Sequence, residues 1–187
     1  MQVELPEMAH VDVAQIYWIG GSPCSGKSSV AEALSARHHL RLAKADDYLE
    51  THMRQADAQR QPVMHRLAGL SWNENFTRPV ETQVQDELVF YREEFPLLLE
   101  EFARLPHDLP LLVEGAALLP EFFVETQDIA SPPPGLEPGR PTETQNFASL
   151  RVVHGCVVYL IPTRPFQLQH YAQRPWVLNI LSQCDYP

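Results

Sequence analysis

The residue types best suited to chemistry form one glycine-rich motif near the N-terminus. Its members are Gly21, Ser22, Pro23, Cys24, Ser25, Gly26, Lys27 and Ser28. They match the spacing G-x-x-x-x-G-K-[ST], in which backbone N–H groups and the following helix N-terminus bind phosphate oxygens. The lysine of such a motif reaches the β- and γ-phosphates, and the serine hydroxyl binds Mg²⁺. We therefore predict that residues 21–29, Ser29 included, bind ATP, with Lys27 catalytic and Ser28 on Mg²⁺.

Carboxylates follow two apolar segments farther along the chain. Asp46 and Asp47 come after residues 40–45, and a carboxylate close to a γ-phosphate can accept the proton of an acceptor hydroxyl. We assign this role to Asp47, with Asp46 as the alternative, and either residue could instead cap a helix. Glu114 follows Leu111-Leu112-Val113, which predicts a carboxylate near Mg²⁺ together with Ser28. The alternative is a strand-terminal glutamate bonded to nearby backbone.

Two arginines follow the last apolar segment and could close a phosphate site. Arg164 and Arg174 are ten residues apart, which is about 15 Å along an unbroken helix. One of them would touch the γ-phosphate from a mobile lid, while the other would serve the acceptor or the nucleotide. The alternative for both is a surface arginine whose aliphatic part covers apolar neighbours.

Short apolar segments alternate with helical patterns and must position these residues. The predicted strands are residues 16–19, 40–45, 110–115 and 156–161, and the predicted helices include 28–39, several between 48 and 105, and 166–183 with a break at Pro175. This alternation indicates an α/β fold with a mainly parallel sheet covered on both faces. Ligands bind at the carboxyl ends of such strands, so we expect the candidate residues to meet there.

The chain fits a single domain over residues 1–187. Its expected regions are a nucleotide-binding core at 15–50, a helical acceptor-site region at 51–106, a proline-rich exposed loop at 131–145 and a lid-like helical region at 163–183. Residues 71–79 mix aromatic and amide side chains, which suits either a polar pocket or a capped helix start.

Charge and composition argue against several classes of binding partner. The net charge of −10 argues against nucleic acid and anionic membranes as partners. No apolar run reaches the ~20 residues of a membrane span, and no signal pattern is present, so we expect a cytoplasmic protein. Three widely spaced cysteines argue against a zinc site. The sequence does not indicate an oligomeric state.

Gly21 to Ser28, Asp46-Asp47, Leu112 to Gly115 and the region of Arg174 resemble the P-loop small-molecule kinases. The most similar branch contains chloramphenicol phosphotransferase, zeta toxin, shikimate kinase and gluconate kinase, and within it the chain resembles a bacterial group to which we attach no substrate. The resemblance implies a P-loop NTPase fold, three-layer α/β/α, with a helical insertion after strand two. It implies transfer of the γ-phosphoryl group of ATP, with Mg²⁺, to a hydroxyl of a small molecule. An aspartate after strand two would handle that hydroxyl, and lid arginines would cover the phosphates.

Two alternatives stay open at this point. A nucleotide-dependent regulatory or toxin-like P-loop NTPase would use binding or slow hydrolysis without metabolite turnover. A degenerate P-loop protein would only bind phosphate. The resemblance also implies a fifth strand after the lid helices, and residues 176–187 show no pattern for it, so we expect a sheet without this last strand. Either the protein continues, or the base is bound in another way, or the N-terminal segment compensates.

Overall fold

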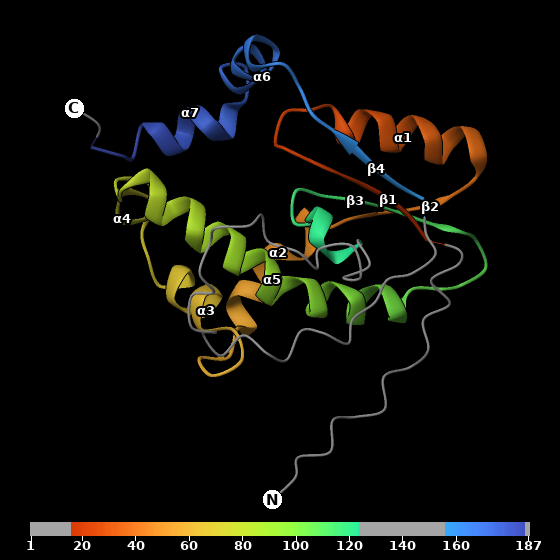
Figure 1. Cartoon of the computed structure of the whole chain (residues 1–187), viewed down its shortest axis with the longest axis horizontal. Coiled ribbons are helices and arrows are strands. Elements are labelled where there is room, and N and C mark those ends of the chain that lie inside the picture. The colour runs from red at the N-terminus through yellow and green to blue at the C-terminus, as the bar shows by residue number, and fades with distance from the viewer. Residues whose placement is uncertain (1–15, 124–155, 186–187) are drawn as a thin grey trace, which may run out of the picture.

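The computed structural model describes residues 16–123 and 156–185, and the proline-rich segment 131–145 lies outside this part of the chain. Within the described residues the chain forms four strands and seven α-helices (Figure 1). The elements are β1 (Ile16–Gly21), α1 (Lys27–His38), β2 (Arg41–Lys44), α2 (Asp46–Gln55), α3 (Pro62–Ala68), α4 (Trp72–Phe76), α5 (Val80–Arg104), β3 (Leu111–Glu114), the short 3-10 helix η2 (Pro120–Phe122), β4 (Val157–Leu160), α6 (Arg164–Tyr171) and α7 (Pro175–Leu181).

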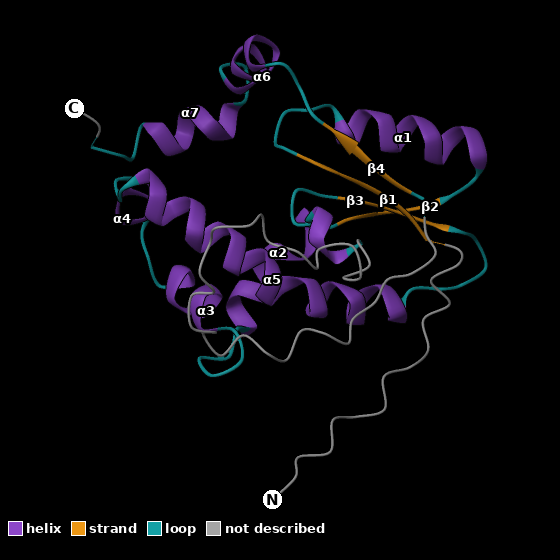
Figure 2. Cartoon of the chain, in the orientation of Figure 1, coloured by secondary structure: helices purple, strands orange, loops and turns teal. Residues whose placement is uncertain are grey.

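The four strands form one parallel sheet in the order β2-β3-β1-β4. Helix α1 packs against β1, β2 and β3, while α2 to α5 lie on the opposite side of the sheet (Figure 2). All four predicted strands are confirmed, with bounds that differ by a residue or two. The architecture is α/β and compatible with a three-layer α/β/α fold, and the helical insertion after the second strand is present as α2 to α5.

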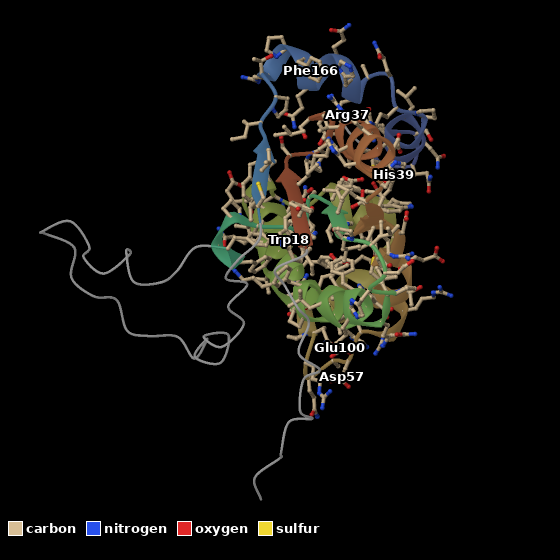
Figure 3. The ribbon with its side chains drawn as sticks, turned by 90° about the vertical axis from the view of Figure 1, so that its right-hand side faces the viewer. Trp18, Arg37, His39, Asp57, Glu100 and Phe166 are labelled. Carbon is tan, nitrogen blue, oxygen red and sulfur yellow. The ribbon has the colours of Figure 1, made fainter. Side chains whose placement is uncertain are left out.

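Alternating side chains on the central strands fill two separate cores. Ile16 and Trp18 of β1 face the helical insertion and pack with Phe95 and Phe102 of α5. Ile19, on the other face, packs with residues of α1 and β3, because neighbouring strand positions mostly point to opposite sides of a sheet. Figure 3 shows Trp18 in the middle of the molecule, and its side chain is fully buried. The strand ends that carry polar groups therefore sit on a rigid, apolar support.

Two of the three prolines in the helical insertion lie at the starts of helices. Pro62 is the first residue of α3 and Pro79 is the N-cap of α5, so both lie where a missing backbone N–H costs little. Pro96, in contrast, lies inside α5, which continues through it to Arg104. Ser71 caps α4, since its side chain accepts the N–H of Glu74 in a capping box. Of the two interpretations of residues 71–79, the capped helix start is confirmed.

Two further expectations concern the limits of the fold. Residues 166–183 form two helices separated near Pro175, as predicted. The fifth strand implied by the resemblance does not occur in residues 16–123 or 156–185. Across those same residues, no helix combines the length and the apolar character that a bilayer crossing requires.

Candidate functional site

The carboxyl ends of three neighbouring strands meet at one edge of the sheet. Glu114, the last residue of β3, lies opposite Ile19 of β1 and Lys44 of β2 in the strand register. The glycine-rich loop follows β1 directly, and α2 begins two residues after Lys44. The register therefore brings the motif, the Asp46-Asp47 pair and Glu114 together, as the sequence predicts.

The loop of residues 21–26 has a backbone that most residues could not adopt. Gly21 has φ of 130°, and a Cβ there would lie 2.2 Å from the carbonyl oxygen of Leu160. Gly26 has φ of 90° and forms the N-cap of α1 without any side-chain cap. Cys24 also has a positive φ of 60°, which is uncommon for a residue with a side chain and marks strain that functional loops often store. The first-turn N–H groups of α1 thus remain available to an anion.

Lys27 closes the loop from the helix side. Its ammonium group donates a hydrogen bond to the carbonyl of Ser22 at 3.0 Å, and the residue is 8% exposed. Burial lowers the pKa of Lys27, and the positive charge of Arg174 acts in the same direction. The carboxylates of Glu114 and Asp46 oppose this shift. A buried cation with two acids and an arginine around it is suited to binding a multiply charged anion.

Ser28 and Glu114 form the direct link between α1 and β3. The Ser28 hydroxyl donates to Glu114 Oε1 at 2.9 Å, and Glu114 is buried. Burial raises the pKa of Glu114, and the negative charge of Asp46 raises it further, while the bond from Ser28 lowers it. These two oxygen donors fit Mg²⁺, which takes one or two protein ligands and completes its shell with phosphates and water. The described part of the chain holds no cluster of three or more His, Cys, Asp or Glu able to bind a metal.

Ser25 of the motif and the following Ser29 differ in their surroundings. The hydroxyl of Ser25 is buried and has no hydrogen-bond partner among the described residues, so it lies in the loop as an orphaned polar atom. A phosphate oxygen would satisfy it, because buried hydroxyls almost always have a partner. Ser29 is exposed on α1 and has no side-chain hydrogen bond within the described residues.

The structure distinguishes the two neighbouring aspartates. Neither is the helix cap, because α2 begins at Asp46 and its N-cap is Ala45. The charge of Asp46 acts on Lys27 and Glu114, at the centre of the site. The charge of Asp47 acts on Lys44 and Tyr48, to one side of it. These electrostatic influences favour Asp46 for the role that we first assigned to Asp47.

The two candidate arginines are not equivalent either. Arg174 is the N-cap of α7, and its charge influences both Lys27 and Tyr171. Its guanidinium has no ion pair within the described residues. Arg164 begins α6 and is exposed, and its side chain has no hydrogen bond or ion pair with the loop in the described residues. The structure brings Arg174 to the loop and does not bring Arg164 there.

Three residues near the site were missed by the sequence analysis. Gln167 of α6 donates from Nε2 to the carbonyl of Pro23 at 3.1 Å and so attaches α6 to the loop. Tyr171 lies close enough to Cys24 and Glu87 for their charges to raise its pKa, after burial as the main cause. Tyr91 of α5 donates to Glu87 at 2.6 Å. None has a sequence signal, since each lies on a helix whose facing side depends on tertiary packing.

The site thus combines a glycine-rich loop, a buried lysine, a serine–glutamate pair, an aspartate and an arginine at one edge of the sheet. Comparisons with known proteins provide no independent test of what this arrangement does. No protein-family model matches the chain, and searches of curated proteins and of solved structures find no significant match to it.

Proposed function

We propose that the chain is an ATP-binding kinase of the P-loop NTPase fold that transfers the γ-phosphoryl group to a hydroxyl of a small molecule. The observation that carries this proposal is the bond from Ser28 to Glu114, 2.9 Å long, beside the buried Lys27. It joins the two oxygen donors that Mg²⁺-phosphate chemistry requires, at the N-terminus of the helix that follows the glycine loop. The orphaned Ser25 hydroxyl supports a phosphate in the same place.

Each residue has a defined task in this proposal. The loop N–H groups and Lys27 bind the phosphates, and Ser28 and Glu114 hold Mg²⁺, which neutralises charge on the phosphates when it is bound. Arg174 contacts the γ-phosphate from outside the loop. Most of the rate enhancement would come from positioning and charge stabilisation, because phosphoryl transfer demands little covalent chemistry from the protein.

The acceptor would bind between α2 and α5. Asp46 also lies near this space, since, after burial as the main cause, its negative charge raises the pKa of Tyr91 and of Glu94 on α5. Burial raises the pKa of Tyr91, so its hydroxyl stays protonated and donates a hydrogen bond to Glu87. Hydroxyl and carboxylate groups of this kind suit a polar acceptor, whose hydroxyl proton Asp46 would receive.

We also propose a soluble metabolite, with no nucleic-acid or membrane partner, as the acceptor. The net charge of −10 disfavours polyanions, although arginine and lysine gather at the loop itself. A cytoplasmic location remains our proposal, because three widely spaced cysteines fit a reducing compartment.

The test is an ADP-release screen with Mg²⁺-ATP across sugars, nucleosides, aminoglycosides and other hydroxyl-bearing metabolites. We expect one class of acceptor to stimulate ADP release in the wild type. With that acceptor, Asp46→Asn should lower turnover by about 10²- to 10⁴-fold, the usual contribution of a general base. The neighbouring Asp47→Asn is the matched control and should change turnover only slightly. Equal effects of the two variants would refute the assignment of Asp46.

A second outcome would refute the transferase itself. ATP binding without stimulation by any acceptor would contradict metabolite turnover and would point instead to a nucleotide-dependent regulatory or toxin-like module.

A further inference from the structure

The α6–α7 segment, residues 164–185, leaves many of its apolar side chains in solvent. Phe166 and Leu168 of α6 are 42% and 58% exposed, and Leu178 and Leu181 of α7 are 56% and 48% exposed. Neither helix is among the elements with extensive contacts to the sheet or to the helical insertion. A segment with so little apolar burial depends on a few polar contacts for its position.

Those contacts lie at the two ends of the segment. At the first end, Gln167 donates to the carbonyl of Pro23 in the glycine loop. At the other end, Asn73 of α4 and Asp185 form a reciprocal pair: Asn73 Nδ2 donates to Asp185 Oδ2 at 3.0 Å, and the Asp185 N–H donates to Asn73 Oδ1 at 2.8 Å. We call this pair the Asn73 clasp. Figure 1 shows α7 running from α6 toward α4, as these contacts require.

Helix α4 is a firm base for the clasp. Its start is fixed by the Ser71 capping box, and the hydroxyl of Thr77 donates back to the carbonyl of Asn73 at 2.7 Å. Just beyond it, Arg78 pairs with Asp86 of α5. Asn73 is thereby held in a fixed place in the helical insertion, on the acceptor side of the site. The clasp in turn fixes the end of α7 relative to α4.

Arg174 lies between the two attachments. It follows Gln167 by seven residues and precedes Asp185 by eleven, and its charge reaches Lys27. We propose that Asn73 is a positioning residue, which holds Arg174 over the glycine loop by clasping Asp185. Part of this inference rests on the proposed function, because it takes phosphate to be the anion that Arg174 meets. The existence of the clasp in solution does not depend on that function.

The clasp and the phosphate site should then stabilise each other. A phosphate that contacts Arg174 favours the position of α6 and α7 in which the clasp is closed, so an intact clasp must strengthen phosphate binding by the same factor. Cys184 reports the state of the clasp, because its thiol lies 3.7 Å from the carbonyl of Trp72 when the clasp is closed. Opening would release this thiol from α4.

The experiment measures alkylation of each cysteine by iodoacetamide in the full chain, resolved by peptide mass. Cys156 is exposed and provides the internal reference, and Cys24 is buried and reports loss of the fold. Asn73→Asp places two carboxylates against each other, and we expect about fivefold to tenfold faster alkylation of Cys184 from this repulsion and the lost bond. Asp185→Asn keeps both bonds and should stay within about twofold of the wild type.

The double variant N73D/D185N tests whether the pair itself controls the alkylation of Cys184. The amide introduced at position 185 can donate to the carboxylate introduced at position 73, and that carboxylate can still accept the backbone N–H of position 185. The pair is therefore restored, and the slow rate should return. Asn179→Asp, which adds the same charge elsewhere on α7, should leave the rate unchanged. The clasp is refuted if N73D alkylates Cys184 at the wild-type rate, or if the double variant remains as fast as N73D.

Misfolding of N73D would show itself as alkylation of Cys24, which is buried in the native chain. In that event Asp185→Ala replaces N73D, because it removes the acceptor of the Asn73 amide without adding a charge. We expect faster alkylation of Cys184 in this variant, and an unchanged rate would refute the clasp.

A second arm uses Mg²⁺ and inorganic triphosphate as the ligand. We expect triphosphate to slow alkylation of Cys184 in the wild type and to lose this effect in Arg174→Ala, while N73D binds triphosphate about fivefold more weakly. Equal protection in Arg174→Ala would overturn the positioning of Arg174. No binding of triphosphate to the wild type would refute the proposed function and the phosphate role of Arg174, while the alkylation rates of the variants would still judge the clasp by themselves.

Discussion

A methyl group added at Gly115 should destabilise the protein by overpacking the junction between β3 and β2. A Cβ at this position would lie 2.5 Å from the Cβ of Ala45, whereas carbon atoms in contact prefer about 3.5–4.0 Å. The two residues therefore have to separate by about 1 Å. Neither backbone is free to move, because Gly115 donates to the carbonyl of Ile19 at 3.1 Å and Ala45 donates to that of Glu114 at 2.8 Å.

Overpacking of this kind costs about 1–3 kcal/mol, so we expect Gly115→Ala to lower the free energy of unfolding by about 2 kcal/mol. Urea denaturation should show a lower midpoint with an unchanged slope, since the change affects native packing and not the surface exposed on unfolding. Gly69→Ala is the matched control. A Cβ there meets only the carbonyl of Arg66, at an ordinary 3.5 Å, and should change stability by less than about 0.5 kcal/mol.

The double variant Gly115→Ala/Ala45→Gly tests the close approach of these two residues directly. Ala45→Gly removes the atom that the new methyl group would strike, and glycine is acceptable at this N-cap position. The loss in free energy of unfolding of the double variant should thus be at least about 1 kcal/mol smaller than the sum of the losses in the two single variants. Strict additivity, or a Gly115→Ala variant as stable as the wild type, would refute the close approach of these two strand ends.

Two further predictions concern buried glutamates of α5, with the exposed Glu100→Gln as the control for both. Burial raises the pKa of Glu94, whose Oε1 lies 3.4 Å from Nδ1 of the buried His52. A raised carboxyl pKa means that the native state holds the proton more tightly, so the contribution of Glu94 to stability is present below the ordinary pKa of 4.5 and is lost as pH rises through the raised value. The stability of Glu94→Gln relative to the wild type, measured by urea denaturation, should therefore increase from pH 4 to pH 7. A stability difference that stays constant over this range would contradict the raised pKa. Glu93 accepts two backbone N–H groups at the start of α3, at 3.1 and 2.8 Å. Glu93→Gln can accept only one of them well and should cost about 1–3 kcal/mol, and an unchanged urea midpoint would count against this anchor.

Much of the fold could be predicted because its determinants are local. β1, β3 and β4 are mainly apolar, β2 has two apolar residues between two basic ones, and the pattern changes at or just after the strand ends, as at Gly20-Gly21 and Asp46-Asp47. Pro62 and Pro175 lie at the first positions of helices, where proline has a preferred place. Pro96 lies inside α5, and the helix continues through it to Arg104. Phe95 and Leu98 are buried on either side of it, so packing against the sheet outweighs the lost hydrogen bond.

The site could be predicted in outline for a similar reason. Parallel strands deliver their carboxyl ends to one edge, so the loop, the aspartates and Glu114 had to lie near one another. The choice between Asp46 and Asp47 depends on the rotation of α2 about its axis, which the packing of the insertion decides. The difference between Arg164 and Arg174 depends on the break between α6 and α7.

Contacts between residues far apart in the sequence could not be predicted at all. Asn73 and Asp185 are 112 residues apart, and Gln167 bonds to Pro23 across 144 residues. Such side chains carry no pattern by which one sequence could connect them. They become visible only when the path of the chain is known.

Calorimetric titration with Mg²⁺-ATP tests the central claim most directly, because the chain has two lysines and only one of them, Lys27, lies in the glycine-rich motif. The wild type should bind Mg²⁺-ATP, and Lys27→Ala should weaken binding at least tenfold by removing the buried charge. Lys44→Ala, whose ammonium pairs with Glu32 at 2.7 Å outside the loop, should bind like the wild type. No binding by the wild type, or equal binding by Lys27→Ala and Lys44→Ala, would contradict a triphosphate site at residues 21–28.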